Sequence, residues 1–174
     1  DLVMGLSDVS AKMLSLNKFV IEKYTNTIVP DFEVFEKAAD KFLTMQFCME
    51  NGIPCPVTID GDTDLLMSKL SFPVIVKPKV GVGAVGFFII ENEEELENRL
   101  SVLEASYGSM IIQEFIPNEN QYTVEAFCDH NSDLKACVIT RKVRFFPIKG
   151  GTSSCNITVN DLGIYNSVKK LLEG

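Results

Sequence analysis

The segment from Pro73 to Phe88, PVIVKPKVGVGAVGFF, constrains the fold and function of this chain more than any other. Its apolar runs, Val74–Val76 and Phe87–Ile90, predict two paired strands joined by a loop that contains Gly81, Gly83 and Gly86. Glycine lets a loop adopt positive φ and approach a ligand closely, and free backbone N–H groups in such a loop surround anions. Because Lys77 and Lys79 add positive charge at its mouth, the segment predicts a triphosphate clamp.

Other glycine-rich nucleotide loops fit this segment less well. A dinucleotide-binding loop shares the spacing G-x-G-x-x-G, but it must open a helix, and Phe87–Ile90 is a poor helix start. The sequence GxxxxGK[ST] is absent, and in protein kinases the lysine follows the loop, whereas Lys77 precedes it. The alternative that stays open on these residues is an ordinary glycine-rich hairpin turn beside a lysine with an apolar stem.

The composition indicates a packed protein whose main partner is not nucleic acid. The 174 residues are 46% hydrophobic, which suffices for one medium domain or two small lobes. The formal net charge of −8 disfavours binding to a phosphodiester backbone. No run approaches the length of a membrane span, and we find no signal peptide. We therefore expect neither a nucleic-acid nor a membrane partner.

The cysteines and the single histidine predict reduced thiols rather than a metal site. The five cysteines are an odd number without a CxxC pair, and His130 lies at a predicted turn with no second histidine. Free thiols are typical of a cytoplasmic protein, which is the location we predict. The chain opens on Asp-Leu-Val-Met and ends within a helical pattern, so we expect a fragment of a longer polypeptide.

Helices and short strands are predicted on both sides of the glycine hairpin. Residues 2–5 and 27–30 are strand-like and residues 8–16 helix-like, but residues 1–39 lack the pattern of a separate core. Asp40 is a typical N-cap for a helix that Asn51-Gly52 ends, and residues 62–70 predict a short helix. Asn92 and Glu95 predict a capping box for the following helix, and residues 110–115 predict a buried strand.

The last third of the chain predicts a long hairpin, a further strand and a helix. Residues 121–147 alternate with the period of a strand around a turn at 131–133. A second glycine loop, residues 150–154, leads into a strand at 156–159, and Asp161 caps the final helix. Strict alternation puts Arg141 on one face of its strand and Lys142 and Arg144 on the other, so these side chains cannot all point into one site.

The order of these motifs resembles that of an ATP-grasp domain over residues 40–174. The matching segments are D-K…G-I-P-x-P (40–56), F-P-V-I-V-K-P (72–78), G-x-G-x-x-G (81–86), Q-E-F-I-P…Q-Y-T-V-E (113–125) and GGTSSCNITV (150–159). The last segment resembles the carbamoyl-phosphate synthetase branch of carboxylate–amine ligases, and the chain looks truncated at both ends.

The resemblance implies an α+β (α/β) fold of two lobes with the ATP site between them. Residues 1–39 would be the tail of a preceding Rossmann-like domain. Residues 40–112 would form the N-terminal lobe, and residues 113–174 an incomplete C-terminal lobe.

The resemblance also implies roles for single residues. The phosphates would be bound by Lys41, Lys77, Lys79 and the loop of Gly81, Gly83 and Gly86, with Gly151 and Thr152 of the second loop also at the nucleotide. The hinge of Glu114, Phe115 and Ile116 would read adenine, Glu114 and Ile116 mostly through main-chain groups. Gln121 falls where many relatives carry a ribose-binding glutamate, and a neutral amide bonds without charge assistance. Arg141 or Arg144 would face the acyl phosphate.

The implied function is that of the ATP-binding part of an ATP-dependent ligase. Such an enzyme activates a small-molecule carboxylate as an acyl phosphate for attack by an amine or a similar nucleophile. Magnesium is implied too, but the family's late acidic pair near an Asn has no match after Val159, so we expect those ligands outside this chain and the chain alone to be inactive. The alternative is a non-catalytic nucleotide-binding module.

Overall fold

The computed structural model describes residues 1–61, 70–117, 120–146 and 152–173. The first elements are small: β1 (Leu2–Val3), α1 (Asp8–Leu16), α2 (Lys18–Ile21), β2 (Asn26–Thr27) and α3 (Phe32–Ala39). β1 and β2 pair in parallel, and few side chains of this segment are buried, chiefly Ser15 and Val29. The expected helix at 8–16 is confirmed. The strand expected within 2–5 covers only Leu2–Val3, the one expected at 27–30 lies at Asn26–Thr27, and α2 and α3 were not predicted.

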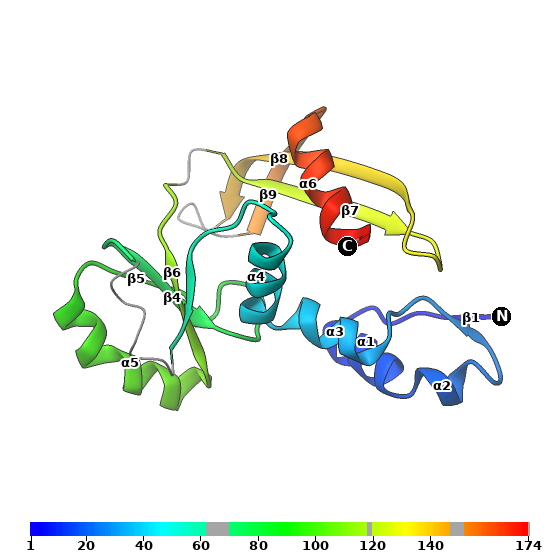
Figure 1. Cartoon of the computed structure of the whole chain (residues 1–174), viewed down its shortest axis with the longest axis horizontal. Coiled ribbons are helices and arrows are strands. Elements are labelled where there is room, and N and C mark those ends of the chain that lie inside the picture. Colours follow the sequence, from blue (N-terminus) through cyan, green and yellow to red (C-terminus); the bar gives the residue numbers. More distant parts are fainter. Residues whose placement is uncertain (62–69, 118–119, 147–151, 174) are drawn as a thin grey trace.

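A four-stranded antiparallel sheet carries the main core of the molecule (Figure 1). Its strands are β3 (Thr58–Asp60), β4 (Val74–Pro78), β5 (Phe88–Ile90) and β6 (Met110–Glu114), in the order β3-β6-β4-β5. Helix α5 (Glu93–Tyr107) covers one face, where the buried residues are Val74, Val76, Ile90, Leu96, Leu103, Met110 and Ile112. The predicted pairing of the strands on either side of the glycine loop is confirmed.

Two helices of this lobe begin at the predicted N-caps. The Asp40 carboxylate accepts hydrogen bonds from the backbone N–H groups of Phe42 and Leu43 and so opens α4 (Lys41–Glu50). The Asn92 side chain accepts from the N–H of Glu95 at the start of α5. The predicted capping box is wrong in one detail, because the Glu95 carboxylate accepts from the N–H of Glu91, one residue before the cap.

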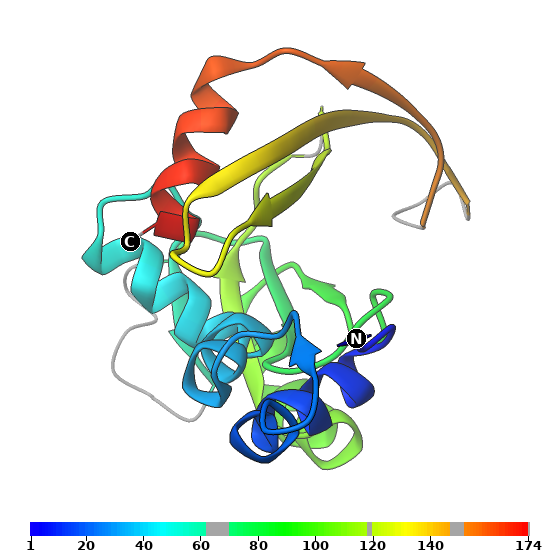
Figure 2. The same ribbon diagram turned by 90° about the vertical axis from the view of Figure 1, so that its right-hand side faces the viewer.

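The second lobe is a three-stranded antiparallel sheet with one helix. Its elements are β7 (Tyr122–Cys128), β8 (Leu134–Phe146), β9 (Thr152–Val159) and α6 (Leu162–Glu173). Figures 1 and 2 show this sheet and α6 on one side of the molecule, apart from the four-stranded sheet, with the C-terminal end of α6 near α4. The Lys170 ammonium donates to the carbonyl of Gly52 at 3.3 Å, which ties α6 to the end of α4.

The pairing of β8 with β9 corrects the prediction made for the arginines. Arg141 pairs with Ile157, but the register shifts between Lys142 and Arg144, so that Arg144 lies opposite Cys155. A β-bulge inserts one extra residue into a strand and resets its alternation. Since residues 155 and 157 of β9 share a face, the bulge at Val143 brings Arg141 and Arg144 onto one face, where strict alternation separates them.

Two further expectations have definite outcomes in the described part of the chain. The turn at 131–133 and the capping of α6 by Asp161 are confirmed, because Asp129 accepts from the N–H of Asp133 and Asp161 accepts from the N–H of Ile164. The expected helix at 62–70 lies almost wholly outside the described residues. No helix in the described part is both long and apolar enough to cross a membrane.

Candidate nucleotide site

Lys41 links the start of α4 to the mouth of the glycine loop. Its backbone N–H donates to the carbonyl of Lys79 at 2.9 Å, and its ammonium donates to the carbonyl of Gly81 at 2.9 Å and, more weakly, to that of Lys79 at 3.3 Å. The side chain is half-buried. The Asp40 cap fixes where the helix begins, so it also fixes the position from which Lys41 reaches the loop.

Lys77 lies on β4, on the face of the sheet opposite α5. Its ammonium donates to the side-chain oxygen of Gln113 on β6 at 2.7 Å, and the Gln113 amide nitrogen donates to the hydroxyl oxygen of Thr58 on β3 at 2.7 Å. Gln113 is only 5% exposed. Gln113 is part of a matching motif, but the sequence predicted no role for it. The available signal was a single amide inside the otherwise buried strand Met110–Gln113.

Lys79 has a different environment from Lys77, although it was predicted to share its role. The Lys79 ammonium lies 2.8 Å from a carboxylate oxygen of Asp60 and 5.7 Å from the centre of the Phe42 ring. Both partners of this ion pair are largely buried. The carboxylate therefore offsets much of the positive charge of Lys79, and the ion pair links β3 to the residue after β4 across the intervening strand β6.

Lys41 is close enough to Lys77 for its charge to affect the ionisation of Lys77. Burial lowers the pKa of Lys77, and the positive charge of Lys41 lowers it further. Burial also lowers the pKa of Lys41, against the opposing effect of the Asp40 carboxylate. Within the described residues neither ammonium forms an ion pair with a carboxylate. An anion placed between them would stabilise both charged forms.

The glycine loop has the backbone conformation that its sequence predicts. Gly81, Gly83 and Gly86 all have positive φ, as does Ala84. Gly86 has a second constraint, because a Cβ there would lie 2.8 Å from a side-chain carbon of Pro78. Residues 80–86 carry only apolar side chains, so the loop itself can offer an anion its backbone N–H groups and nothing else.

The predicted adenine hinge follows directly after β6. The Glu114 N–H donates to the carbonyl of Val57 and its carboxylate accepts from the Val57 N–H, so this residue also anchors the strand end to the segment before β3. Phe115 is half-buried, whereas Ile116 is 56% exposed. Gln121 is half-buried directly before β7, and its carbonyl accepts from the N–H of Lys142.

The remaining predicted residues lie in the second lobe. Arg141 donates to the side-chain oxygen of Asn120 at 3.2 Å, and Arg144 is exposed. Thr152 begins β9, and Gly151 lies outside the described residues. The structure thus brings Lys41, Lys77 and the glycine loop together in the first lobe, while the arginines come from the second.

The described residues do not supply a metal site. No three or more His, Cys, Asp or Glu side chains in the described ranges are grouped so that they could share an ion. Magnesium takes oxygen ligands, usually carboxylates together with phosphate. These residues alone therefore do not fit a magnesium centre, and the expectation of ligands elsewhere stays a prediction.

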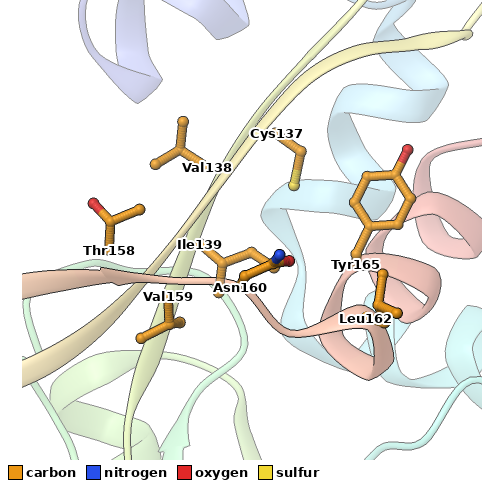
Figure 3. A pocket seen from close by; sticks show the side chains of 8 residues that line it. All are labelled: Cys137, Val138, Ile139, Thr158, Val159, Asn160, Leu162 and Tyr165. Carbon is orange, nitrogen blue, oxygen red and sulfur yellow. The ribbon is translucent and has the colours of Figure 1, made fainter.

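A hollow of about 340 Å³ lies in the second lobe, between α6 and the strands β8 and β9. Figure 3 shows Cys137 and Ile139 from β8 and Leu162 and Tyr165 from α6 around it. None of the predicted site residues is among those that line it. This mainly apolar hollow is thus separate from the lysines and the glycine loop.

Comparisons with known proteins show the family to which the chain belongs. The model of the ATP-grasp domain family matches residues 38–172. The chain is 25% identical to a D-aspartate ligase of Enterococcus faecium over 193 aligned positions, which cover 99% of this chain and 46% of that protein. It is 26% identical to the carbamoyl phosphate synthase large chain of Campylobacter jejuni over 132 positions, 71% of this chain and 12% of that protein.

A solved structure shows the same fold. It is the ADP complex of an N5-carboxyaminoimidazole ribonucleotide synthetase, with a TM-score of 0.70 at 13% identity, covering 98% of this chain and 46% of that one. The chain therefore spans less than half the length of each of these proteins. Because the family model matches most of the residues, the chain belongs to the ATP-grasp family, as its motifs predicted.

Proposed function

We propose that this ATP-grasp domain binds ATP between its two lobes, with the triphosphate held by Lys41, Lys77 and the backbone of the glycine loop. One observation carries the proposal. The half-buried ammonium of Lys41 contacts the glycine loop, and its charge lowers the pKa of half-buried Lys77 on the strand that leads into the loop. Neither ammonium is paired with a carboxylate among the described residues. Such a pair is unfavourable without an anion, and a triphosphate supplies one.

The expected electrostatic contribution is large enough for this role. A single ammonium about 4 Å from a phosphate charge contributes on the order of 4 kcal/mol at an effective dielectric constant near 20, before desolvation is subtracted. The apolar loop of residues 80–86 would then close over the phosphates through its N–H groups, which is the part that glycine makes possible. Lys79 would act mainly by fixing the loop, since Asp60 already balances its charge.

The base and the ribose would lie along the connection between the lobes. Phe115 and Ile116 follow the last strand of the first sheet, where they offer apolar contact and main-chain groups to adenine. Gln121 would bond the ribose hydroxyls through its neutral amide. The ADP bound in the structurally similar synthetase supports a nucleotide in a fold of this kind.

We propose further that the whole protein is an ATP-dependent ligase. The relatives named above include a D-aspartate ligase, so the expected substrate is a small carboxylate. Its oxygen would take the γ-phosphoryl group as ADP leaves, and an amine would then attack the acyl carbon and displace inorganic phosphate. Here Arg141 and Arg144, which share a face of β8, are the candidates for holding the acyl phosphate. The chain's own contribution would be positioning and charge stabilisation of the transferring group.

The alternative is a nucleotide-binding module without transfer chemistry. The neutral Gln121 favours it, since an amide grips the ribose without charge assistance. ADP formation by the full-length protein in the presence of candidate carboxylates would separate the two, because a module that only binds produces none.

ATP binding itself has a direct test on this chain. Ligand at about 100 times its dissociation constant should raise the free energy of unfolding by roughly 2.7 kcal/mol, seen as a higher midpoint of thermal unfolding. The absence of any shift at millimolar ATP would contradict the proposed function.

A further inference from the structure

We propose that Gln113 and Thr58 are positioning residues that aim the Lys77 ammonium at the nucleotide while leaving its charge uncompensated. This inference rests on the proposed function, since it assumes that Lys77 meets the triphosphate. It starts from a chain of hydrogen bonds across three strands, from Lys77 on β4 through Gln113 on β6 to Thr58 on β3. Both Gln113 and Thr58 are buried, so their positions are set by packing.

The direction of every hydrogen bond in this chain is fixed by chemistry. The Thr58 hydroxyl donates its single hydrogen to the carbonyl of Pro56 at 3.0 Å, so its oxygen is left to accept from the amide nitrogen of Gln113. That contact turns the amide oxygen of Gln113 toward Lys77. In a flipped amide, the NH₂ group of Gln113 would face the Lys77 ammonium. Both groups are donors, and a lysine ammonium has no acceptor.

Lys77 donates to a neutral acceptor, the amide of Gln113, whereas the neighbouring Lys79 donates to a charged one, the carboxylate of Asp60. Lys79 lies two residues further along and pairs with the Asp60 carboxylate, which offsets its charge. Lys77 meets an amide instead, which holds the ammonium by a hydrogen bond but carries no net charge. The full positive charge of Lys77 is thus available to a polyanion. Lys41 on α4, which lies nearby, also has a positive charge.

Gln113→Met removes both hydrogen bonds of the amide at a similar side-chain volume. We expect ATP affinity to fall by about tenfold, because an ammonium that is no longer positioned loses about one charged hydrogen bond to the triphosphate. AMP affinity should fall by less than about twofold. In a Lys77→Met background the same change should have no further effect, because the amide acts through Lys77. Calorimetric titration of the four proteins with ATP and AMP gives the comparison.

Thr58 provides a matched pair of variants that leaves Gln113 in place. Thr58→Val removes the hydroxyl at nearly constant shape and should weaken ATP binding by about threefold to tenfold. Thr58→Ser keeps the hydroxyl and should restore most of that loss. A purely structural role of Thr58 would change thermal unfolding of the ATP-free protein without this difference between ATP and AMP.

Gln113→Glu tests the neutrality of the acceptor. A carboxylate beside the ammonium should move the alkaline limb of the ATP-binding profile up by about one pH unit or more. The other charged groups near Lys77, Lys41 on α4 and the Lys79–Asp60 pair, are unchanged in this variant.

The inference and the proposed function fail in different ways. If the unaltered chain does not bind ATP, the proposed function fails. The positioning role is overturned, and the ATP site stands, if the unaltered chain, Gln113→Met and Thr58→Val all bind ATP equally well. The same holds if the loss of affinity caused by Gln113→Met adds to the loss caused by Lys77→Met. An unshifted pH profile in Gln113→Glu overturns the claim about charge.

Discussion

The two lobes of this molecule differ sharply in how well they are packed. In the first, helix α5 seals one face of the four-stranded sheet, and Val74, Val76, Ile90 and Met110 have no exposed surface. In the second, Ile139 is the only buried residue among the described side chains of β7, β8, β9 and α6. A hollow of about 340 Å³ even borders that residue. The first lobe thus has a fully buried core, and the second is one three-stranded sheet with a single helix packed on it.

This difference matches the division of the proposed site. The groups that must hold a fixed geometry, Lys77 and its partners Gln113 and Thr58, stand on the well-packed sheet. The arginines stand on the thin one, whose main-chain bulge at Val143 resets the alternation of β8. The half that we propose to bind the phosphates therefore has a buried core behind it, and the half proposed to meet the carboxylate has fewer buried side chains.

Truncating one core residue in each lobe tests the comparison most strongly. Ile112→Ala should lower the free energy of unfolding by about 4 kcal/mol, because its surroundings have little room to collapse. Ile139→Ala should cost about 2 kcal/mol, because a hollow already lies beside it. Chemical denaturation measures both. Equal losses, or a larger loss at Ile139, would remove the distinction between the lobes.

A second pair of variants separates the stability of the first lobe from its function. Asp40→Ala and Asn92→Ala each delete a helix N-cap and should each cost about 1 kcal/mol of stability. Only Asp40→Ala should also weaken ATP binding, because α4 carries Lys41 and α5 carries no proposed ligand. Thermal unfolding and ATP titration of the two proteins check this. Equal ATP affinities would mean that the start of α4 does not position Lys41.

The lowered pKa values of Lys77 and Lys41 predict opposite trends for stability and binding. In the folded chain the ammonium form of Lys77 is penalised, so this group opposes folding at neutral pH and its penalty disappears as the pH rises from its lowered pKa toward the ordinary value of 10.5. The stability of the unaltered protein relative to Lys77→Met should therefore improve with pH in that window.

ATP affinity should fall over the same range, since the triphosphate binds the ammonium form. Denaturation of both proteins at several pH values, with ATP titrations alongside, gives the two trends. A stability difference that stays constant with pH would show that burial does not perturb Lys77.

Much of the fold was predictable because the signals were local. The caps at Asp40, Asn92 and Asp161 and the glycine loop depend on a few adjacent residues, and all are found where the sequence places them. The strand pairs around the loop follow from short apolar runs. Helix α2 was missed because its four residues are too few to show a period, whereas α3 was missed although Phe32, Phe35 and Ala39 recur at helical spacing.

The site was only partly predictable, because its partners come from distant strands. The register that sets Gln113 against Thr58 and Ile75, and so within reach of Lys77, joins residues dozens of positions apart. Nothing near Lys79 in the sequence indicated that Asp60 would pair with it. The bulge at Val143 likewise depends on how β9 pairs with β8, and no local pattern announced it.

The central claim is that Lys41 and Lys77 together form the triphosphate site. Its most direct test is calorimetric titration of ATP into the unaltered chain, Lys77→Met, the double variant Lys41→Met/Lys77→Met, and Lys170→Met as a control lysine that bonds Gly52 instead. We predict a loss of about 1.5–3 kcal/mol of binding free energy for Lys77→Met, no measurable binding by the double variant, and an unchanged affinity for Lys170→Met. A double variant that binds ATP as tightly as the unaltered chain would contradict the account.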